Sequence, residues 1–190
     1  MSTLKSLLLK NRSYRRFDQS RTISRDELLE MVDAARVSGS ARNAQPIKYF
    51  LSFDRETNDK IFSTLAWAGY LSDWPGPKDG ERPSAYLIQL HDTTLGANYF
   101  CDDGIAAQSI LLTAVECGLG GCIIASVKKE KLMESLQIPG HLAIIQVIAL
   151  GKPVEKVKLE ELKEGDFKYW RDKDQVHHVP KRSLKELVIN

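Results

Sequence analysis

Between residues 24 and 150, stretches with helical periodicity alternate with four short runs that are typical of β-strands. Helices are predicted over residues 24–38, 56–67, 103–117 and 128–136, and strands over 47–53, 85–90, 122–125 and 142–150. This alternation constrains the fold more than any other feature, because helices and strands taken in turn favour a central sheet with helices on both faces. We therefore expect one sheet buried between two helical layers.

Local signals mark where several of these elements begin and end. Ser24, followed three residues later by Glu27, forms a capping box at the start of the first of these helices. Asp102 is expected to cap the helix over 103–117, which Gly118 ends. Residues 74–83 contain three prolines and two glycines, and they are predicted to form the largest loop of the chain.

The C-terminal part of the chain has a different composition. Residues 152–173 are highly charged and show little periodicity, and the sequence becomes apolar again over 179–189. A segment of roughly 40 residues cannot bury a core of its own. We therefore expect residues 1–190 to form a single domain in which 152–190 is an arm that either wraps this domain or crosses onto a second subunit.

Composition excludes several classes of protein. The 27 basic and 25 acidic residues nearly cancel, which argues against a nucleic-acid partner. The apolar N-terminal run is too short for a secretory signal, and the region 105–127 is interrupted by polar residues, so no membrane span is expected. Cys117 and Cys122 lack the spacing of zinc ligands, and the three cysteines are expected to be free thiols in a reducing cytoplasm.

The sequence also lacks the common catalytic motifs. It contains no nucleophile elbow, no phosphate-binding Walker loop and no HExxH motif. His177 and His178 would point in opposite directions along a strand, which makes them a poor pair of metal ligands. They are expected to be surface or core histidines. An enzyme without visible acid–base groups usually takes its chemistry from a cofactor.

Two clusters of polar residues could bind such a cofactor. Residues 11–17 concentrate three arginines and a serine, and the planar guanidinium matches phosphate oxygens two at a time. Residues 38–46 contain Ser40, Asn43 and Gln45, whose donors and acceptors suit the edge of a heterocycle. Each cluster has a simpler interpretation, as a solvated basic stretch and as a turn. In an extended chain, Ser13 and Arg15 share a face, with Arg12 opposite unless the chain turns.

Two further segments are ambiguous when taken alone. Lys181 and Arg182 could join the N-terminal arginines around one anion, or lie on the surface. The glycines of residues 118–121 follow a helix and open a strand, which is the reverse of the order in a dinucleotide-binding fingerprint. We therefore reject a Rossmann fold. These glycines are expected to let the backbone approach a flat group.

Taken together, these stretches resemble the FMN-dependent nitroreductase family over nearly the whole chain. The resemblance lies in residues 11–17, 40–46, 103–108 with 118–122, and 148–153, which are similar to four motifs of the family in the same order. It implies an α+β sandwich with a central, mainly antiparallel or mixed sheet flanked by helices, and an intertwined homodimer with FMN sites at its interface. The chain departs from the family pattern at Gly39, Ile47, Ile123 and, in the phosphate motif, at Asn11, where an arginine is usual.

The resemblance also implies a role for each matching residue. Ser13 would bind the FMN phosphate with Arg12 nearby, and Arg15 would lie at the N1/O2 edge of the flavin. The ring system would be contacted by Ser40, Asn43 and Gln45, with Ser40 coming from the neighbouring subunit. The backbone N–H groups of Ala125 and Ser126 would approach flavin N5 and O4, and Lys181 and Arg182 would close the phosphate site.

The implied activity is that of an FMN-dependent NAD(P)H oxidoreductase that reduces nitroaromatics, quinones or related acceptors in a ping-pong reaction. NADH or NADPH would be the donor, flavin N5 would carry the chemistry, and no metal would take part. Two alternatives are a reductive dehalogenase or flavin-fragmenting enzyme of the same fold, and a non-catalytic FMN-binding module. Trp67, Tyr70 and Trp74 either roof the acceptor site or pack in the core or dimer interface.

Overall fold

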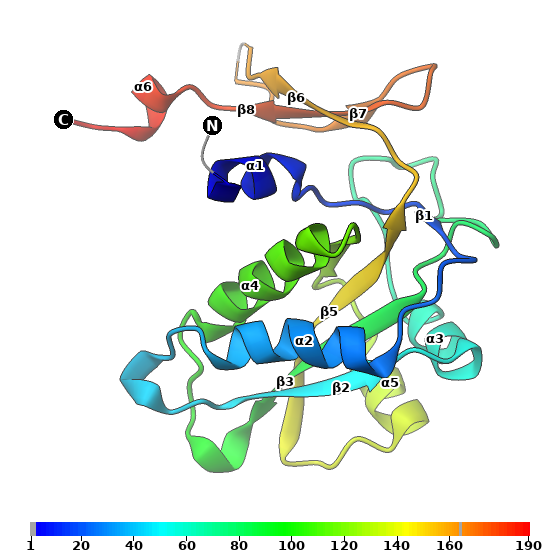
Figure 1. The fold of residues 1–190 in the computed structure, drawn as a ribbon, viewed down its shortest axis with the longest axis vertical. Coiled ribbons are helices and arrows are strands. Elements are labelled where there is room, and N and C mark those ends of the chain that lie inside the picture. The colour runs from blue at the N-terminus through cyan, green and yellow to red at the C-terminus, as the bar shows by residue number, and fades with distance from the viewer. Residues whose placement is uncertain (1–2, 164) are drawn as a thin grey trace.

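The computed structural model describes residues 3–163 and 165–190 (Figure 1). Within these residues, the central sheet has the strand order β1-β5-β3-β2, and β4 also pairs with β5. Its strands are β1 (Phe17–Asp18), β2 (Ile47–Ser52), β3 (Ala85–Asp92), β4 (Gly120–Ile124) and β5 (Leu142–Pro153). Each pairing between these strands is antiparallel. The 12-residue β5 organises the sheet, since β3 pairs with it along one edge and β1 and β4 along the other.

Helices cover both faces of this sheet, as the alternation of patterns predicts (Figure 1). On one face, α2 (Arg25–Arg36) and α4 (Asp102–Glu116) pack in one apolar cluster, which includes Leu87 of β3. On the other face, α3 (Arg55–Phe62) and α5 (Lys129–Leu136) pack in a second cluster, which includes the next residue, Ile88. Both side chains are fully buried, and each such burial contributes about 1.5–3 kcal/mol to folding. The α+β sandwich is therefore confirmed.

Most predicted element boundaries agree with the structure, and the capping box of α2 is confirmed. The Ser24 hydroxyl accepts from the Glu27 backbone, and the Glu27 carboxylate accepts from the Ser24 backbone at 2.8 Å. Gly118 has φ +73°, a left-handed conformation that suits glycine just past the end of α4. Residues 74–83 contain no helix or strand, in agreement with the predicted loop.

Several boundaries differ from the prediction, and three of these differences have a clear cause. The N-cap of α4 is Cys101, and Asp102 lies inside the helix, where its carboxylate holds a neighbouring loop instead. α3 ends at Phe62 rather than at residue 67, because the chain turns and Leu65 forms a β-bridge with Val127. β4 begins at Gly120, two residues earlier than expected, since the glycines themselves pair with β5.

The arm contains a small sheet of its own, which the charged sequence did not suggest. The strand β8 (His177–Lys181) pairs in parallel with β6 (Val157–Glu161) and in antiparallel with β7 (Trp170–Arg171). The short helix α6 (Leu184–Leu187) follows this sheet. This sheet lies beside α1 (Thr3–Lys10), at the end of the molecule away from α2 (Figure 1). The arm thus contacts its own domain, and its crossing onto a second subunit stays a prediction.

Two features are absent from the residues that the structure describes. None of the helices there is long and apolar enough to span a membrane. No group of three or more potential ligands in the same residues could hold a metal ion.

Candidate functional site

Two adjoining cavities lie between the N-terminal segment, β4 and the arm. The first, which we call the basic cavity, has a volume of about 310 Å³, at the lower end of the range for ligand pockets. Its polar lining comes from Asn11, Arg12, Ser13, Arg15, Gln108, Tyr169, His177 and Lys181. The second, which we call the amide cavity, has a volume of about 190 Å³, and Ala125 and Ser126 are among the residues that line it. Arg15, Ile123 and Tyr169 line both cavities, so the two lie next to each other.

Glycines in β4 hold the N-terminal segment in place. Ser13 forms a parallel bridge with Gly121, and the Tyr14 N–H donates to the Gly121 carbonyl at 3.0 Å. A Cβ at Gly120 would lie 2.7 Å from the Tyr14 ring, and one at Gly121 would lie 2.4 Å from the Ala149 carbonyl oxygen. The glycines were predicted to let the backbone approach a flat group, and in the structure Gly120 approaches the Tyr14 ring of the same chain. These contacts place Ser13 beside β4 at the wall of the basic cavity.

The arginines of the N-terminal segment have different environments. Arg16 forms a two-pronged ion pair with Glu81, at 2.9 and 2.7 Å, and lies outside both cavities. Arg12 donates from Nη2 to the Leu8 carbonyl at 2.6 Å, whereas its buried Nε has no hydrogen-bond partner among the described residues. An unpaired buried donor is costly. Arg12 therefore carries unused hydrogen-bonding capacity at the basic cavity.

The basic cavity has a strong positive character. Arg12, Arg15 and Lys181 line it, and its described lining contains no carboxylate. Arg182 lies outside it and pairs with Glu186 at 3.3 Å on the surface. The predicted convergence of the arm's cations with the N-terminal arginines therefore holds for Lys181 and not for Arg182. Such a cavity suits an anion that accepts several hydrogen bonds.

Arg15 lies where the two cavities meet. Its Nη1 donates to the Ser13 carbonyl at 3.2 Å and lies 3.4 Å from His177 Nε2. The guanidinium carbon lies 5.0 Å from the centre of the Tyr169 ring, within range of a cation–π contact. The Arg15 backbone N–H donates to the Glu155 carboxylate at 2.8 Å. The side chain is thus held from several directions between the basic cavity and the amide cavity.

A buried ion pair lies behind Arg15. Glu155 accepts from Arg171 Nη2 at 2.7 Å, and the side chains of the two residues are 0% and 9% exposed, respectively. Burial lowers the pKa of the neighbouring His177 to about 4, with Arg15 and Arg171 acting in the same direction and Glu155 opposing them. The imidazole is therefore neutral at physiological pH.

The amide cavity offers unpaired backbone donors. Ala125 and Ser126 follow directly after β4, and their N–H groups have no acceptor among the described residues. The buried indole Nε1 of Trp67, which also lines this cavity, has no partner in the same part of the chain. Donors that converge on one small space can orient the polar edge of a ring.

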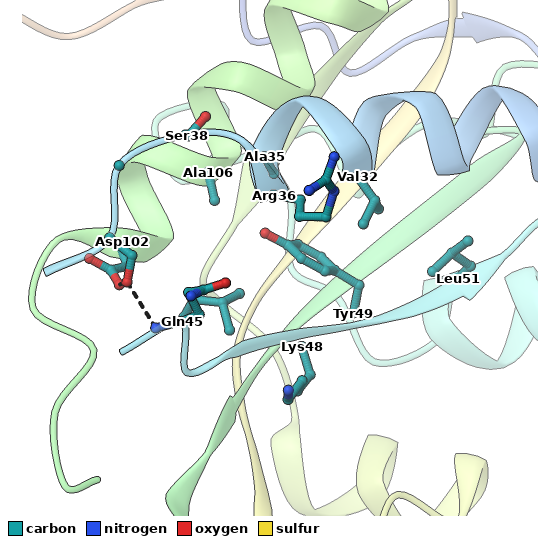
Figure 2. A pocket seen from close by; sticks show the side chains of 13 residues that line it. Val32, Ala35, Arg36, Ser38, Gln45, Lys48, Tyr49, Leu51, Asp102 and Ala106 are labelled. Carbon is teal, nitrogen blue, oxygen red and sulfur yellow. Dashed lines mark hydrogen bonds between the residues drawn. The ribbon is translucent and has the colours of Figure 1, made fainter. Parts of the chain in front are cut away.

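The predicted Ser40, Asn43 and Gln45 do not join these cavities within one chain. Ser40 and Gln45 line a third cavity of about 380 Å³ between α2, β2 and α4, where Tyr49 projects from β2 toward α2 (Figure 2). Asn43 lies on the exposed turn beside them, where its side-chain oxygen accepts from the Gln45 amide at 3.1 Å. These three residues could reach the basic or amide cavity only from a second copy of the chain.

The loop that carries these residues has an unusual backbone. Arg42, Asn43 and Gln45 all have positive φ, at 56°, 55° and 50°. The buried carboxylate of Asp102 holds this conformation by accepting from the Ser40 hydroxyl at 2.6 Å and from the backbone N–H that follows it at 2.9 Å. Positive φ in several non-glycine residues is strained, and such strain concentrates at functional sites.

Comparison with known proteins identifies the family and the fold of this chain. The sequence model of the Nitroreductase family matches residues 8–75 and 96–152, which is more than half of the chain. The chain belongs to the nitroreductase family. The matched regions include the N-terminal arginines, the strained loop and β4, so the nitroreductase resemblance of these segments is confirmed.

Named relatives of this nitroreductase-family chain are distant. A Methanothermobacter thermautotrophicus protein, provisionally named NADH dehydrogenase/NAD(P)H nitroreductase, is 27% identical over 162 residues, with 82% of this chain and 80% of that protein covered. An FMN-dependent nitroreductase from Clostridium difficile is similar in structure, with a TM-score of 0.64, 20% identity and coverage of 79% and 87% of the two chains. A gut-bacterial enone reductase has a TM-score of 0.69 at 18% identity, with coverage of 87% and 95%.

Sequence reasoning missed two residues of this site in the nitroreductase fold. Tyr169 and His177 both line the basic cavity, and both come from the arm. The sequence around them is charged and lacks periodicity, so it does not reveal that the arm folds back onto Arg15. The one sequence signal for His177 was its position next to His178 in a strand, because side chains of adjacent strand residues face different surroundings.

Proposed function

We propose that this nitroreductase-family protein is an FMN-dependent NAD(P)H oxidoreductase that reduces nitroaromatics, quinones or related acceptors. Membership of the family supports a general oxidoreductase activity, and the names of the relatives support a nicotinamide donor and a flavin. The observation that carries the proposal is the basic cavity, where Arg12, Ser13, Arg15 and Lys181 converge with no carboxylate in the described lining.

The residues present fit the phosphate end of FMN. A phosphate dianion takes several charged hydrogen bonds, and the buried, unpaired Nε of Arg12 and the Ser13 hydroxyl are available to donate them. Lys181 would add a second positive group, from the arm. In this proposal it also compensates for Asn11, which stands where the family pattern has an arginine.

The amide cavity would receive the ring system. When bound there, the flavin would supply hydride transfer between a nicotinamide and an acceptor. Arg15 would then lie at the N1/O2 edge of the ring, where its positive charge stabilises the negative charge that reduction places there. The N–H groups of Ala125 and Ser126 would orient the opposite edge. No side chain need act as a catalytic acid, since solvent can supply the proton.

The partners of the reaction follow from this arrangement. NADH or NADPH and the acceptor would use the same open face of the ring in turn, which predicts ping-pong kinetics. In the proposed homodimer, Ser40, Asn43 and Gln45 would complete the ring site of the other subunit, and Arg182 would approach the phosphate only if the arm shifts. We place the protein in the cytoplasm, which its three free thiols support.

One experiment separates this proposal from a non-catalytic flavin-binding module. The purified protein is loaded with FMN, mixed anaerobically with NADH or NADPH, and followed by the absorbance of the oxidised flavin. Rapid bleaching, followed by recovery when a nitroaromatic or quinone is added, is the expected result. Flavin that stays bound and unbleached with both nucleotides would instead identify a binding module. A protein that retains no FMN would contradict both.

A further inference from the structure

The Arg15 guanidinium contacts two residues of the arm, Tyr169 and His177. We propose that Tyr169 and His177 are positioning residues that hold the Arg15 guanidinium at the junction of the two cavities and thereby tune the reduction potential of the bound flavin. The effect on potential rests on the proposed function above. The contact of Tyr169 and His177 with the Arg15 guanidinium, which we call the clamp, is a property of the protein without cofactor.

Both clamp residues contact the same functional group. His177 Nε2 lies 3.4 Å from Arg15 Nη1, and the Tyr169 ring lies 5.0 Å from the guanidinium carbon. The two aromatic rings also pack on each other, with centres 5.0 Å apart and planes inclined at 45°. The Tyr169 hydroxyl accepts from the Tyr70 backbone N–H at 3.4 Å, which anchors the ring to the domain. Arg15 is therefore held by a rigid pair rather than by one flexible neighbour.

The chemistry of the contact determines the protonation of His177. A guanidinium only donates hydrogen bonds, so His177 Nε2 must accept and the proton must lie on Nδ1. The charged and titratable groups around this imidazole are Arg15, Arg171, Glu155 and the adjacent His178. Burial and the two arginines lower the pKa of His177 to about 4, which keeps it neutral and able to accept. Its Nδ1 is buried and has no partner in the described residues.

The clamp leaves the charge of Arg15 unneutralised. Glu155, the nearby carboxylate, binds the Arg15 backbone N–H with one oxygen and the Arg171 side chain with the other. The groups that hold the guanidinium are a carbonyl, a neutral imidazole and an aromatic face. A fixed positive charge without a carboxylate partner has a larger effect on a nearby ring than a mobile or paired one, because water and counter-charges screen it less.

The clamp is first tested without flavin. Nitrogen-15 spectra of the imidazole groups in the cofactor-free protein at neutral pH report which nitrogen carries the proton. We expect His177 to be neutral with the proton on Nδ1, and Arg15→Ala to change that signal. A proton on Nε2, or a charged His177, would overturn the proposal.

The effect on potential is tested in the FMN-loaded protein. His177→Leu and Tyr169→Leu remove the acceptor and the ring face, whereas His177→Gln and Tyr169→Phe retain them. Each leucine variant should shift the equilibrium between reduced and oxidised flavin about tenfold toward the oxidised form, or ~30 mV for two electrons. Each conservative variant should keep the potential close to that of the wild-type protein.

His178→Gln is the matched control, because the His178 side chain contacts Glu160 and Asp172 within the arm. An equal shift in this control, or unchanged potentials in both leucine variants, would overturn the proposal. If the wild-type protein binds no FMN, the proposed function fails, and the imidazole spectra still decide the clamp. The same spectra decide it if the leucine variants do not fold.

Discussion

Glu155 accepts a hydrogen bond from the backbone N–H of Arg15 at 2.8 Å and leaves the Arg15 guanidinium without a carboxylate partner. The two residues lie near opposite ends of the sequence and are brought together where the arm leaves β5. The Glu155 carboxylate therefore binds the Arg15 backbone N–H and the Arg171 side chain, and it does not neutralise the positive charge of the basic cavity.

Removing one member of the buried pair should be strongly destabilising. Glu155→Ala leaves Arg171 buried and unpaired, so we expect the free energy of unfolding to fall by about 3–5 kcal/mol. Urea denaturation measures this loss. The double variant with Arg171→Met, which removes the orphaned charge, should recover a large part of it. A loss below about 1 kcal/mol in Glu155→Ala would show that the buried pair does not stabilise the folded arm.

Arg12 should be needed for FMN retention rather than for folding. Arg12→Ala removes a charged hydrogen-bond donor from the basic cavity, and FMN affinity should fall by about 1.5–3 kcal/mol. Quenching of flavin fluorescence during titration measures this affinity. The exposed Arg25, at the start of α2, provides the control, since Arg25→Ala should leave FMN affinity unchanged. Equal affinity in Arg12→Ala and wild type would remove Arg12 from the phosphate site.

Gly121 should be intolerant of any side chain. In Gly121→Ala the new Cβ would lie 2.4 Å from the Ala149 carbonyl oxygen, so β4 or its neighbour must shift. We expect a loss of about 1–3 kcal/mol in stability, as for other overpacked sites, together with weaker FMN binding through the displaced Ser13. Gly140→Ala is the control, because its Cβ would meet no atom within 4 Å. The two variants are compared by their midpoints of thermal unfolding. Equal midpoints would contradict the close approach of Gly121 to the Ala149 carbonyl.

The arm should lose stability as the pH rises through neutrality. Hydrogen bonds to Asp172 and Glu160 raise the pKa of His178 above its ordinary value, so protonated His178 stabilises the folded arm. This contribution is complete below the ordinary pKa of about 6.5 and is lost as the pH rises through the higher folded value. Trp170, which stacks on His178 at 4.9 Å, provides a fluorescence signal for the arm.

His178→Gln should flatten this pH dependence, since glutamine does not titrate. A wild-type arm whose stability rises with pH over the same range would contradict the assigned charge. Exchange of the β8 backbone amides with solvent deuterium would measure the same effect without fluorescence.

The sheet and its helices were predictable because their signals are local. The capping box at Ser24 and the long apolar run of β5 each fix an element without reference to the rest of the chain. The end of α3 was not predictable, because it depends on pairing between Leu65 and Val127, which are far apart in sequence. Long-range pairing overrides local helical preference there.

The site was predictable only in part, for a similar reason. Arg12, Ser13 and Arg15 stand in one dense motif, and the structure brings them together with Lys181. Tyr169 and His177 reach the same cavity only through the folding of the arm, and no local pattern marks that contact. Ser40, Asn43 and Gln45 lie apart from it in one chain, so their predicted role depends on a second copy.

Equilibrium titration of the cofactor-free protein with FMN and with riboflavin tests the central claim most directly, because the two ligands differ only in the phosphate. The account predicts that FMN binds at least about 100-fold more tightly, since charged hydrogen bonds from the basic cavity each contribute about 1.5–3 kcal/mol. Equal affinity for the two ligands, or binding of neither, would contradict it.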